Sequence, residues 1–307
     1  MNRAIFWLYC ALLASGLVAG CGNGREPTVI VYCAQDQVYA ESLLAEFSRQ
    51  TGIKARAVFD SEAVKTVGLA NRLLAEKNNP QCDVFWGNEE LRTRQLAAQA
   101  VFRATNGFAT FGFRSRRIVV NTNKLSLAQA PRTFTELTNA VWRGRVALAY
   151  PMFGTTATHF LALRQHWGEA AWEAWCRALQ ANKPFLVDGN SVVVKFVARG
   201  EAWIGLTDSD DIEAGIREGL SVAAVPLSPE SLLIPNTVAV VRNAPHPQEA
   251  ERLFVFLQSE AVAKRLVEAH ALEGVGSAPQ AVLQVDWDAL LKEIEPGTAV
   301  MKEIFLR

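Results

Sequence analysis

The most informative segment of the chain is residues 202–211, AWIGLTDSDD. Its apolar first half, with Trp203 and Ile204, predicts a buried β-strand. Three aspartates and two hydroxyl residues occupy the last five positions, where the strand must end. In open α/β sheets ligands bind beyond the carboxyl ends of the strands, so the segment predicts a polar site at a sheet edge. The alternative is a solvated turn in which Thr207 or Asp208 caps the next helix.

Other predicted strands end in polar residues in the same way. These residues are Asp36 after the strand at 28–32, Asn88 and Glu89 after 82–86, Thr155 and Thr156 after 146–149, and Asn190 after 185–187. The repetition favours one shared cleft over a set of unrelated turns.

The predicted elements divide the chain into two α/β units. Three strands alternate with helices from residue 28 to the polar helix that follows Glu90, an order typical of parallel strands joined by right-handed crossovers. A long extended segment at 108–121, with Arg114, Arg116 and Arg117 in its middle, is expected to cross to a second unit. Thr133 and Glu136 there have capping-box spacing. A length of 307 residues with 50% hydrophobic residues is sufficient for two lobes.

The charge balance excludes some partners. Lys plus Arg and Asp plus Glu number 31 each, so there is no net field to attract nucleic acid or an acidic membrane.

Catalysis is not expected either, because the chain has no Gly-x-Ser-x-Gly elbow and no His-Glu-x-x-His motif. The four histidines lack metal-ligand spacing and are interpreted as structural.

The N-terminus has the pattern of a targeting signal. Arg3 precedes an apolar stretch at 4–18 that is too short to span a membrane comfortably. The following LVAGC, ending at Cys21, resembles the bacterial lipobox, which implies a signal peptide over 1–21 and a lipid on the Cys21 thiol. An ordinary secretory signal is the alternative.

The three remaining cysteines lack disulfide or zinc spacing and are interpreted as small buried hydrophobes: Cys33, Cys82 and Cys176.

Several short segments carry a family resemblance. They are Val31-Tyr32, Thr51-Gly52-Ile53-Lys54, Cys82-Asp83-Val84-Phe85-Trp86, Gly200-Glu201-Ala202 and Asn236-Thr237-Val238-Ala239. In this order, over about residues 28–270, the chain resembles the periplasmic solute-binding proteins of ABC importers, in the ferric-iron-binding branch of the type II fold. The resemblance implies an α/β fold of two lobes with mixed sheets, joined by two crossing hinge strands. Lobe I would be 27–116 and 232–307, and lobe II 117–231.

The resemblance also implies a ligand-binding set. Its members are Gln35, Asp36, Glu62, Lys65, Asn88, Glu89, Gly154, Thr155, Thr156, Asn190, Thr207 and Asp208. The expected metal ligands are Asp36, Glu89, Asp208 and, in addition to this set, Asp210, and the turn at 154–156 with Asn190 is expected to hold an anion. Helix capping is the alternative role for most of these residues, and which of Asn88 and Glu89 faces the cleft stays open.

One departure from the family bears on the ligand. Ferric binders usually present two adjacent tyrosines where this chain has Thr207-Asp208-Ser209-Asp210-Asp211. Carboxylates without Tyr, Cys or His favour hard cations such as Ca²⁺, Mn²⁺ or Mg²⁺. The expected function is capture of ferric iron or another hard cation, with or without a synergistic anion, as cargo and without a cofactor. The alternative is a small organic or oxyanion solute, for uptake or sensing.

The resemblance implies the setting in which this cargo is handled. We expect a monomer held in the periplasm by its lipid anchor, which works with ABC permease and ATPase subunits.

Overall fold

The structure is a computed structural model that describes residues 26–59, 65–103, 107–276 and 282–306. The predicted signal peptide and Cys21 lie outside this part of the chain, so the lipid anchor stays a prediction. Cys33, Cys82 and Cys176 are buried thiols. Burial raises the pKa of the Cys82 and Cys176 thiols well above their usual range, which suits their expected role as small apolar residues.

The first lobe is built on three parallel strands. They are β1 (Thr28–Cys33), β2 (Lys54–Val58) and β3 (Val84–Gly87), and they alternate with α2 (Gln37–Thr51), α3 (Lys65–Ala75) and α4 (Glu90–Ala98). Helix α2 ends where the sequence predicts, because Gly52 adopts φ 70° and its N–H bonds to the Ser48 carbonyl. Leu43, Leu44 and Phe47 of α2 pack on this sheet.

The second lobe repeats this arrangement. Its parallel strands are β5 (Val146–Ala149), β6 (Phe185–Val187) and β7 (Ile204–Asp208), with α5 (Gly154–Trp167), α6 (Glu169–Ala181), α7 (Asn190–Ala198) and α8 (Ser209–Arg217). The short strand β8 (Val222–Ala224) pairs with the long strand that enters this lobe. The predicted strands at 146–149 and 185–187 are confirmed at both ends. Their bounds could be predicted because each strand is a short apolar run between turn residues.

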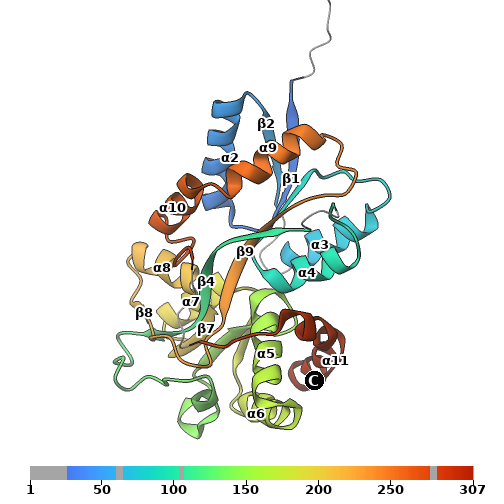
Figure 1. Cartoon of the computed structure of the whole chain (residues 1–307). Coiled ribbons are helices and arrows are strands. Elements are labelled where there is room, and N and C mark those ends of the chain that lie inside the picture. Colours follow the sequence, from blue (N-terminus) through green and yellow to red (C-terminus); the bar gives the residue numbers. More distant parts are fainter. Residues whose placement is uncertain (1–25, 60–64, 104–106, 277–281, 307) are drawn as a thin grey trace, which may run out of the picture.

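Two strands connect the lobes, as predicted. Strand β4 (Ala109–Asn121) pairs with β9 (Leu233–Val240) through its first half and with β7 and β8 through its second half. Strand β9 also pairs with β3, so the strand order across the described residues is β2-β1-β3-β9-β4-β7-β5-β6. In Figure 1, β4 and β9 run side by side from the upper lobe into the lower one. The two-lobed α/β fold is thereby confirmed.

The C-terminal helices divide between the lobes. Helix α9 (Pro247–Leu257) packs on β1, β3 and β9, and α10 (Glu260–Glu268) follows it. Helix α11 (Trp287–Phe305) instead packs on α5 and α6 of the second lobe and on α4 of the first (Figure 1). The ion pair between Arg94 and Asp288, at 3.1 Å, joins α4 to α11. The predicted lobe boundaries therefore stay a prediction, with α11 in contact with both lobes.

The predicted capping box at Thr133 and Glu136 is wrong. The chain forms two short 3₁₀ turns there, η1 (Thr135–Thr138) and η2 (Ala140–Trp142), and η1 has no side-chain cap. The Glu136 carboxylate accepts from the Arg132 N–H at 2.9 Å instead of from Thr133. Burial of Phe134 and Leu137 in the hydrophobic core of the second lobe accounts for the two 3₁₀ turns.

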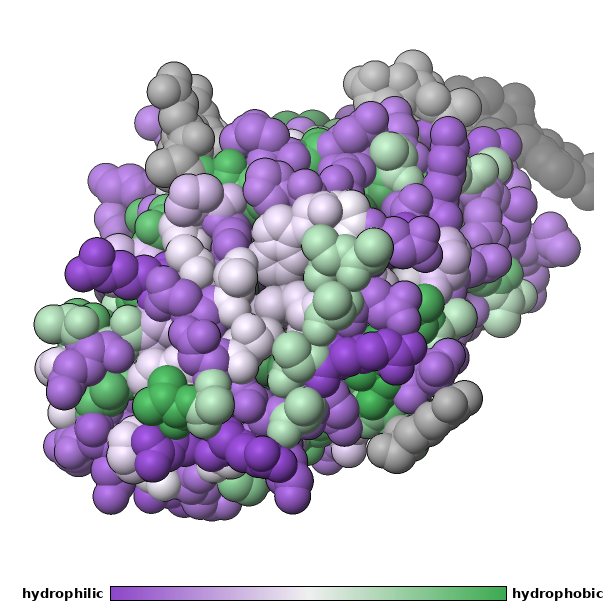
Figure 2. All heavy atoms as spheres, turned by 90° about the horizontal axis from the view of Figure 1, so that it is seen from below, coloured by the Kyte–Doolittle hydropathy of each residue, from purple (hydrophilic) through white to green (hydrophobic). Residues whose placement is uncertain are grey.

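The face on the side of α6 is mixed in polarity. Figure 2 shows hydrophilic residues over much of it, with residues of weak hydropathy in the middle and strongly hydrophobic ones in small separate groups. Scattered apolar residues of this kind are normal on a protein surface in contact with water. Among the described residues, none of the helices has the length and apolar character needed to cross a membrane.

Candidate functional site

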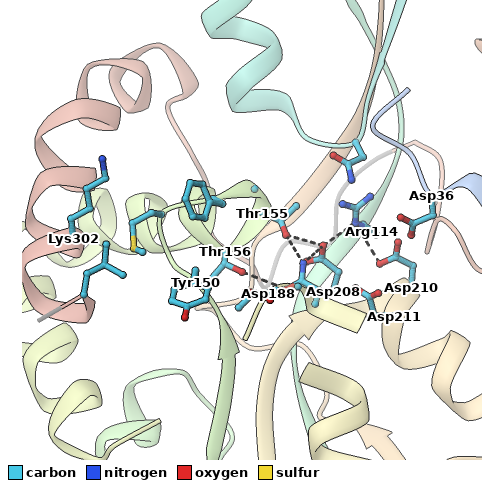
Figure 3. Close-up of a pocket in the computed structure, with 18 residues that line it drawn as sticks. Asp36, Arg114, Tyr150, Thr155, Thr156, Asp188, Asp208, Asp210, Asp211 and Lys302 are labelled. Carbon is cyan, nitrogen blue, oxygen red and sulfur yellow. Dashed lines mark hydrogen bonds and ion pairs between the residues drawn. The ribbon is translucent and has the colours of Figure 1, made fainter. Parts of the chain in front are cut away.

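A cavity of about 380 Å³ lies between the two lobes. Its lining comes from the ends of β1 and β3, from hinge strand β4, from the starts of α5, α7 and α8, and from the end of α11. The lining residues are Asp36, Asn88, Arg114, Ala149, Tyr150, Met152, Phe153, Gly154, Thr155, Thr156, Asp188, Gly189, Asn190, Asp208, Asp210, Asp211, Lys302 and Leu306. Figure 3 shows Asp36, Arg114, Asp208, Asp210 and Asp211 together on one side of the close-up and Lys302 on the other. The strand ends that the sequence singles out therefore meet at one cavity.

Asp208 is the anchor of this polar cluster. It ends β7, and its carboxylate accepts from Arg116 at 2.8 Å and from Thr155 at 2.8 Å. Arg114 at 3.2 Å and Asn190 at 3.1 Å complete four donors for its two oxygens. Burial alone raises the pKa of this carboxyl, but Arg116 and Arg114 outweigh burial and hold the pKa below its usual range.

Arg116 positions the helix starts around Asp208. Its side chain is fully buried and donates to Asn190 at 3.0 Å and to Thr156 at 3.2 Å. Asn190 in turn donates to Thr155 at 3.0 Å. The first residues of α5 and α7 are thus fixed to β4 and β7 by a network of charge-assisted hydrogen bonds. The network connects these side chains into one floor of the cavity.

Arg114 connects the floor to further carboxylates. It lies on the same face of β4 as Arg116, and its guanidinium is 3.4 Å from Asp210. Burial lowers the pKa of Arg114, but Asp210 and Asp208 more than offset this and raise it. Carboxylate oxygens of Asp208, Asp210 and Asp211 lie within 4.8 Å of one another. Asp36 approaches this group from the first lobe (Figure 3).

Glu89 does not line the cavity, whereas its neighbour Asn88 does. The fully buried carboxylate of Glu89 caps α4 by accepting from the Leu91 and Arg92 N–H groups at 2.9 and 3.0 Å. It also accepts from Thr158 of α5, at 3.1 Å, across the lobe interface. Burial raises the pKa of Glu89 against the opposing effects of Arg92 and these hydrogen bonds. Its predicted role as a metal ligand therefore has no geometric support.

The remaining predicted site residues are not among the described lining of the cavity. Gln35 is buried next to Asp36 but is not part of the lining. Thr207 faces α7 and donates to the Asn190 carbonyl at 3.0 Å. Glu62 and the side chain of Lys65 lie outside the described part of the chain. Of the predicted set, the structure thus brings together Asp36, Asn88, Gly154, Thr155, Thr156, Asn190, Asp208 and Asp210.

Sequence reasoning missed several residues of the site. Arg114 and Arg116 were noted only as part of a crossing strand, although their spacing of two places both on one face of it. Tyr150, Met152 and Phe153 lie in a strand-end loop that was already singled out, so they could have been added. Nothing in the sequence pattern indicates that Lys302 and Leu306 reach the cavity, because α11 arrives there by long-range packing.

Comparison with known proteins identifies the family. Residues 29–270 match the family of bacterial extracellular solute-binding proteins. The major ferric iron-binding protein of Neisseria meningitidis is 25% identical over 276 residues, which cover 81% of each chain. An Fe(3+)-binding periplasmic protein of Serratia marcescens is 30% identical over 217 residues, 64% of this chain and 62% of its own.

Solved structures agree on the fold. Iron-bound HitA from Pseudomonas aeruginosa superposes with a TM-score of 0.77 at 20% identity, over 91% of this chain and 99% of its own. AfuA from Actinobacillus pleuropneumoniae, solved with fructose-6-phosphate, gives a TM-score of 0.75 at 18% identity, over 91% and 97%. These neighbours confirm the type II periplasmic binding protein fold, and the relatives confirm the resemblance to its ferric-iron-binding branch. The chain belongs to the family of bacterial extracellular solute-binding proteins.

Proposed function

We propose that the protein is the substrate-binding subunit of an ABC importer, and that it captures a hard metal cation together with an anion between its lobes. The observation that carries this proposal is the placement of carboxylates from both lobes at one cavity. Asp36 comes from the first lobe, and Asp210 and Asp211 come from the second. Five aspartates line the cavity, against Arg114 and Lys302 in the described lining and Arg116 beneath Asp208, so the excess of negative charge favours a cation.

The cation is assigned to Asp36, Asp210 and Asp211 rather than to Asp208. Four donors already bond to the Asp208 carboxylate, three of them to Oδ2 and one to Oδ1, so a metal at this group would compete with buried ion pairs. Oxygen-only ligands suit Ca²⁺, Mn²⁺ and Mg²⁺. Ferric iron is included because the Serratia and Neisseria relatives are named as iron-binding proteins.

The anion is assigned to the starts of α5 and α7. Gly154, Thr155 and Asn190 line the cavity with the first turns of these helices. The unpaired N–H groups and the dipole of a helix N-terminus favour negative charge. Because the side chains of Thr155 and Asn190 are held by Asp208 and Arg116, the backbone N–H groups are the donors that remain for the anion.

Capture and release follow from the hinge. A ligand that contacts both lobes stabilises the closed form by its differential affinity for it, and opening about β4 and β9 releases the ligand. In the cell the lipid on Cys21 would keep the protein in the periplasm next to its permease, which accepts the cargo.

Titration calorimetry of the metal-stripped protein tests the proposal. Mn(II), Ca(II) and Fe(III)–citrate are titrated into the wild type, Asp36→Asn, Asp210→Asn and the control Glu295→Gln, an exposed residue of α11 away from the cavity. We expect at least one metal form to bind, with an affinity loss of about tenfold or more in the two aspartate variants because each removes a charged ligand. The absence of heat with every metal form would reject the proposal.

A second candidate ligand is a small organic or oxyanion solute without a metal. The cavity volume of about 380 Å³ and the apolar Met152, Phe153 and Leu306 favour it, since small-molecule pockets have this size and character. AfuA, solved with fructose-6-phosphate, has the same fold. Native mass spectrometry of the freshly purified protein separates the candidates, because a retained organic mass without metal supports this one.

A further inference from the structure

Helix α8 turns one side of its surface towards the first lobe. Glu213 and Arg217 are four residues apart, so their side chains project from the same side of this helix. Arg217 donates a hydrogen bond to the Tyr39 hydroxyl of α2 at 2.8 Å, and the Glu213 carboxylate lies 3.9 Å from the ring of His270, two residues beyond the end of α10. In Figure 1 the end of α10 lies directly above α8. A helix of the second lobe therefore contacts the first lobe at two places.

The contact between Tyr39 and Arg217 is the closer of the two. Only 8% of the Tyr39 surface is exposed, and the Arg217 guanidinium lies over its ring, 5.9 Å from the ring centroid. Burial raises the pKa of Tyr39, so the phenol stays neutral and its oxygen accepts the bond from the charged donor. Hydrogen bonds with one ionised partner are stronger than those between neutral groups. The pair therefore forms a specific bond between the two lobes.

The same two helices bring aspartates to the cavity. Asp36 precedes α2 and Tyr39 lies in its first turn, whereas Asp210 lies in the first turn of α8 and Arg217 is its last residue. The charge of Asp210 also contributes to the raised pKa of Tyr39, so this phenol lies close to the aspartates of the cavity. The approach of α2 to α8 therefore controls how close the carboxylates of Asp36 and Asp210 come to each other.

Closure of the lobes brings like charges together. Asp36 of the first lobe approaches Asp210 of the second, and Arg114 offsets only part of their repulsion because it also pairs with Asp208. Rotation about β4 and β9 would separate α2 from α8 and break the bond between them. A contact that exists only in the closed form stabilises that form with or without a ligand. The bond between α2 and α8 therefore acts against the repulsion before a ligand arrives.

We propose that Tyr39 and Arg217 form a latch between the lobes that holds the cavity closed before a solute enters. They are positioning residues, since neither belongs to the described lining, and they act by bringing Asp36 and Asp210 together. The latch sets the ratio of closed to open molecules in the ligand-free protein. Its action is the same whichever solute the cavity binds.

Small-angle X-ray scattering of the metal-stripped protein tests the latch without a ligand. The proteins compared are the wild type, Tyr39→Phe, Arg217→Met and the double variant. The matched control is Tyr32→Phe, which removes the hydroxyl of another buried tyrosine, whose partner Glu76 belongs to the same lobe and lies at 2.8 Å.

We expect a compact wild type and a larger radius of gyration in the Tyr39 and Arg217 variants. The ratio of open to closed molecules should rise about three- to tenfold, the range of one net hydrogen bond. The double variant should be no more open than the more open single variant, because both substitutions remove the same bond. Tyr32→Phe should scatter like the wild type.

Circular dichroism of each variant separates opening of the lobes from unfolding. Because Arg217 is exposed, Arg217→Met removes the bond without disturbing the core, and it decides the test if Tyr39→Phe fails to fold. Equal scattering curves for the wild type and Arg217→Met would overturn the latch, as would an equal expansion in Tyr32→Phe. None of these results depends on a metal, so the proposed metal-binding function is accepted or rejected by its own titrations.

Discussion

Two buried carboxylates, Asp208 and Glu89, occupy equivalent places in the two lobes. Each follows a parallel strand and precedes a helix, and neither is more than 2% exposed. Asp208 contacts two buried arginines, and its pKa is lowered. Glu89 accepts only from backbone N–H groups and a threonine, and its pKa is raised.

The difference shows that burial alone does not set the charge of a strand-end carboxylate. Opposite charges within about 4 Å stabilise the ionised carboxylate by more than burial destabilises it. Hydrogen bonds from neutral donors do not always offset the effect of burial. Asp208 is therefore a permanent anion that organises the cavity floor. Glu89 is a cap at the lobe interface, whose ionisation is opposed by its surroundings.

The largest effect is expected on removing the charge of Asp208. In Asp208→Asn, Arg114 and Arg116 stay buried without their shared counter-charge. We expect a loss of about 3–5 kcal/mol in the free energy of unfolding, the usual cost of breaking a buried ion pair from one side. Denaturant unfolding monitored by tryptophan fluorescence measures it.

The matched control for this prediction is Asp211→Asn. Asp211 lies in the same acidic group but is less buried, and its charge acts on Arg114 more weakly than the charges of Asp210 and Asp208 do. We expect a change within about 0.5 kcal/mol, as for most surface substitutions. Equal losses in both variants would contradict the assignment of Asp208 as the anchor.

A smaller effect is expected in the pH dependence of stability. Because the pKa of Glu89 is raised in the folded protein, the unfolded chain releases this proton first, and stability falls as pH rises from the usual glutamate value towards the raised one. Asp208 has the opposite sign: its lowered pKa gives stability that is lost as pH falls below the usual aspartate range.

Glu89→Gln isolates the first of these slopes. The substitution should cost about 1 kcal/mol at the acid end of the range, because the amide is a poorer cap for α4. This cost should shrink as pH rises, because only the wild type loses stability there. Chemical denaturation of both proteins between pH 4 and 8 gives the difference curve. A wild-type slope that survives unchanged in the variant would assign the slope to another group.

The smallest effect concerns His159, a neighbour of the Asp208 network. Its ring nitrogen bonds to the Glu230 carbonyl at 2.8 Å, and burial together with Arg116 lowers its pKa to about 3. We expect its ¹⁵N NMR shifts to stay constant between pH 5 and 8, with free histidine in the same tube as a reference. A titration midpoint above pH 5 would contradict the combined effect of burial and Arg116 on this ring.

Much of the fold follows from local sequence patterns. The bounds of β5 and β6 were predicted to the residue, and the end of α2 at Gly52 was predicted from its C-cap. Both depend on signals that act over a few residues, namely short apolar runs and a helix-ending glycine. The capping-box prediction at Thr133 failed because burial of Phe134 and Leu137 outweighed the local motif. The position of α11 could not be predicted, since an amphipathic helix does not specify which surface it meets.

The site was predicted in part for the same reason. Strand ends can be located from the sequence, so Asp36, Thr155, Asn190 and Asp208 were placed together correctly at one cavity. The partners of Asp208 could not be found this way, because Arg114 and Arg116 lie 94 and 92 residues away in the chain. Unless these arginines are known, the sequence does not distinguish a carboxylate that already pairs with buried side chains from one that can bind a ligand.

The bridging position of α11 has a practical consequence. Leu306, the last described residue, lies in the lining of the cavity, so any segment fused behind it would begin beside the ligand. An affinity tag or an immobilising linker at that end would compete with solutes for access to the cavity. It would also disturb the packing of α11 against α4 and α5. Sensors or surface-coupled forms of this protein are therefore better attached at the opposite end of the chain, next to β1.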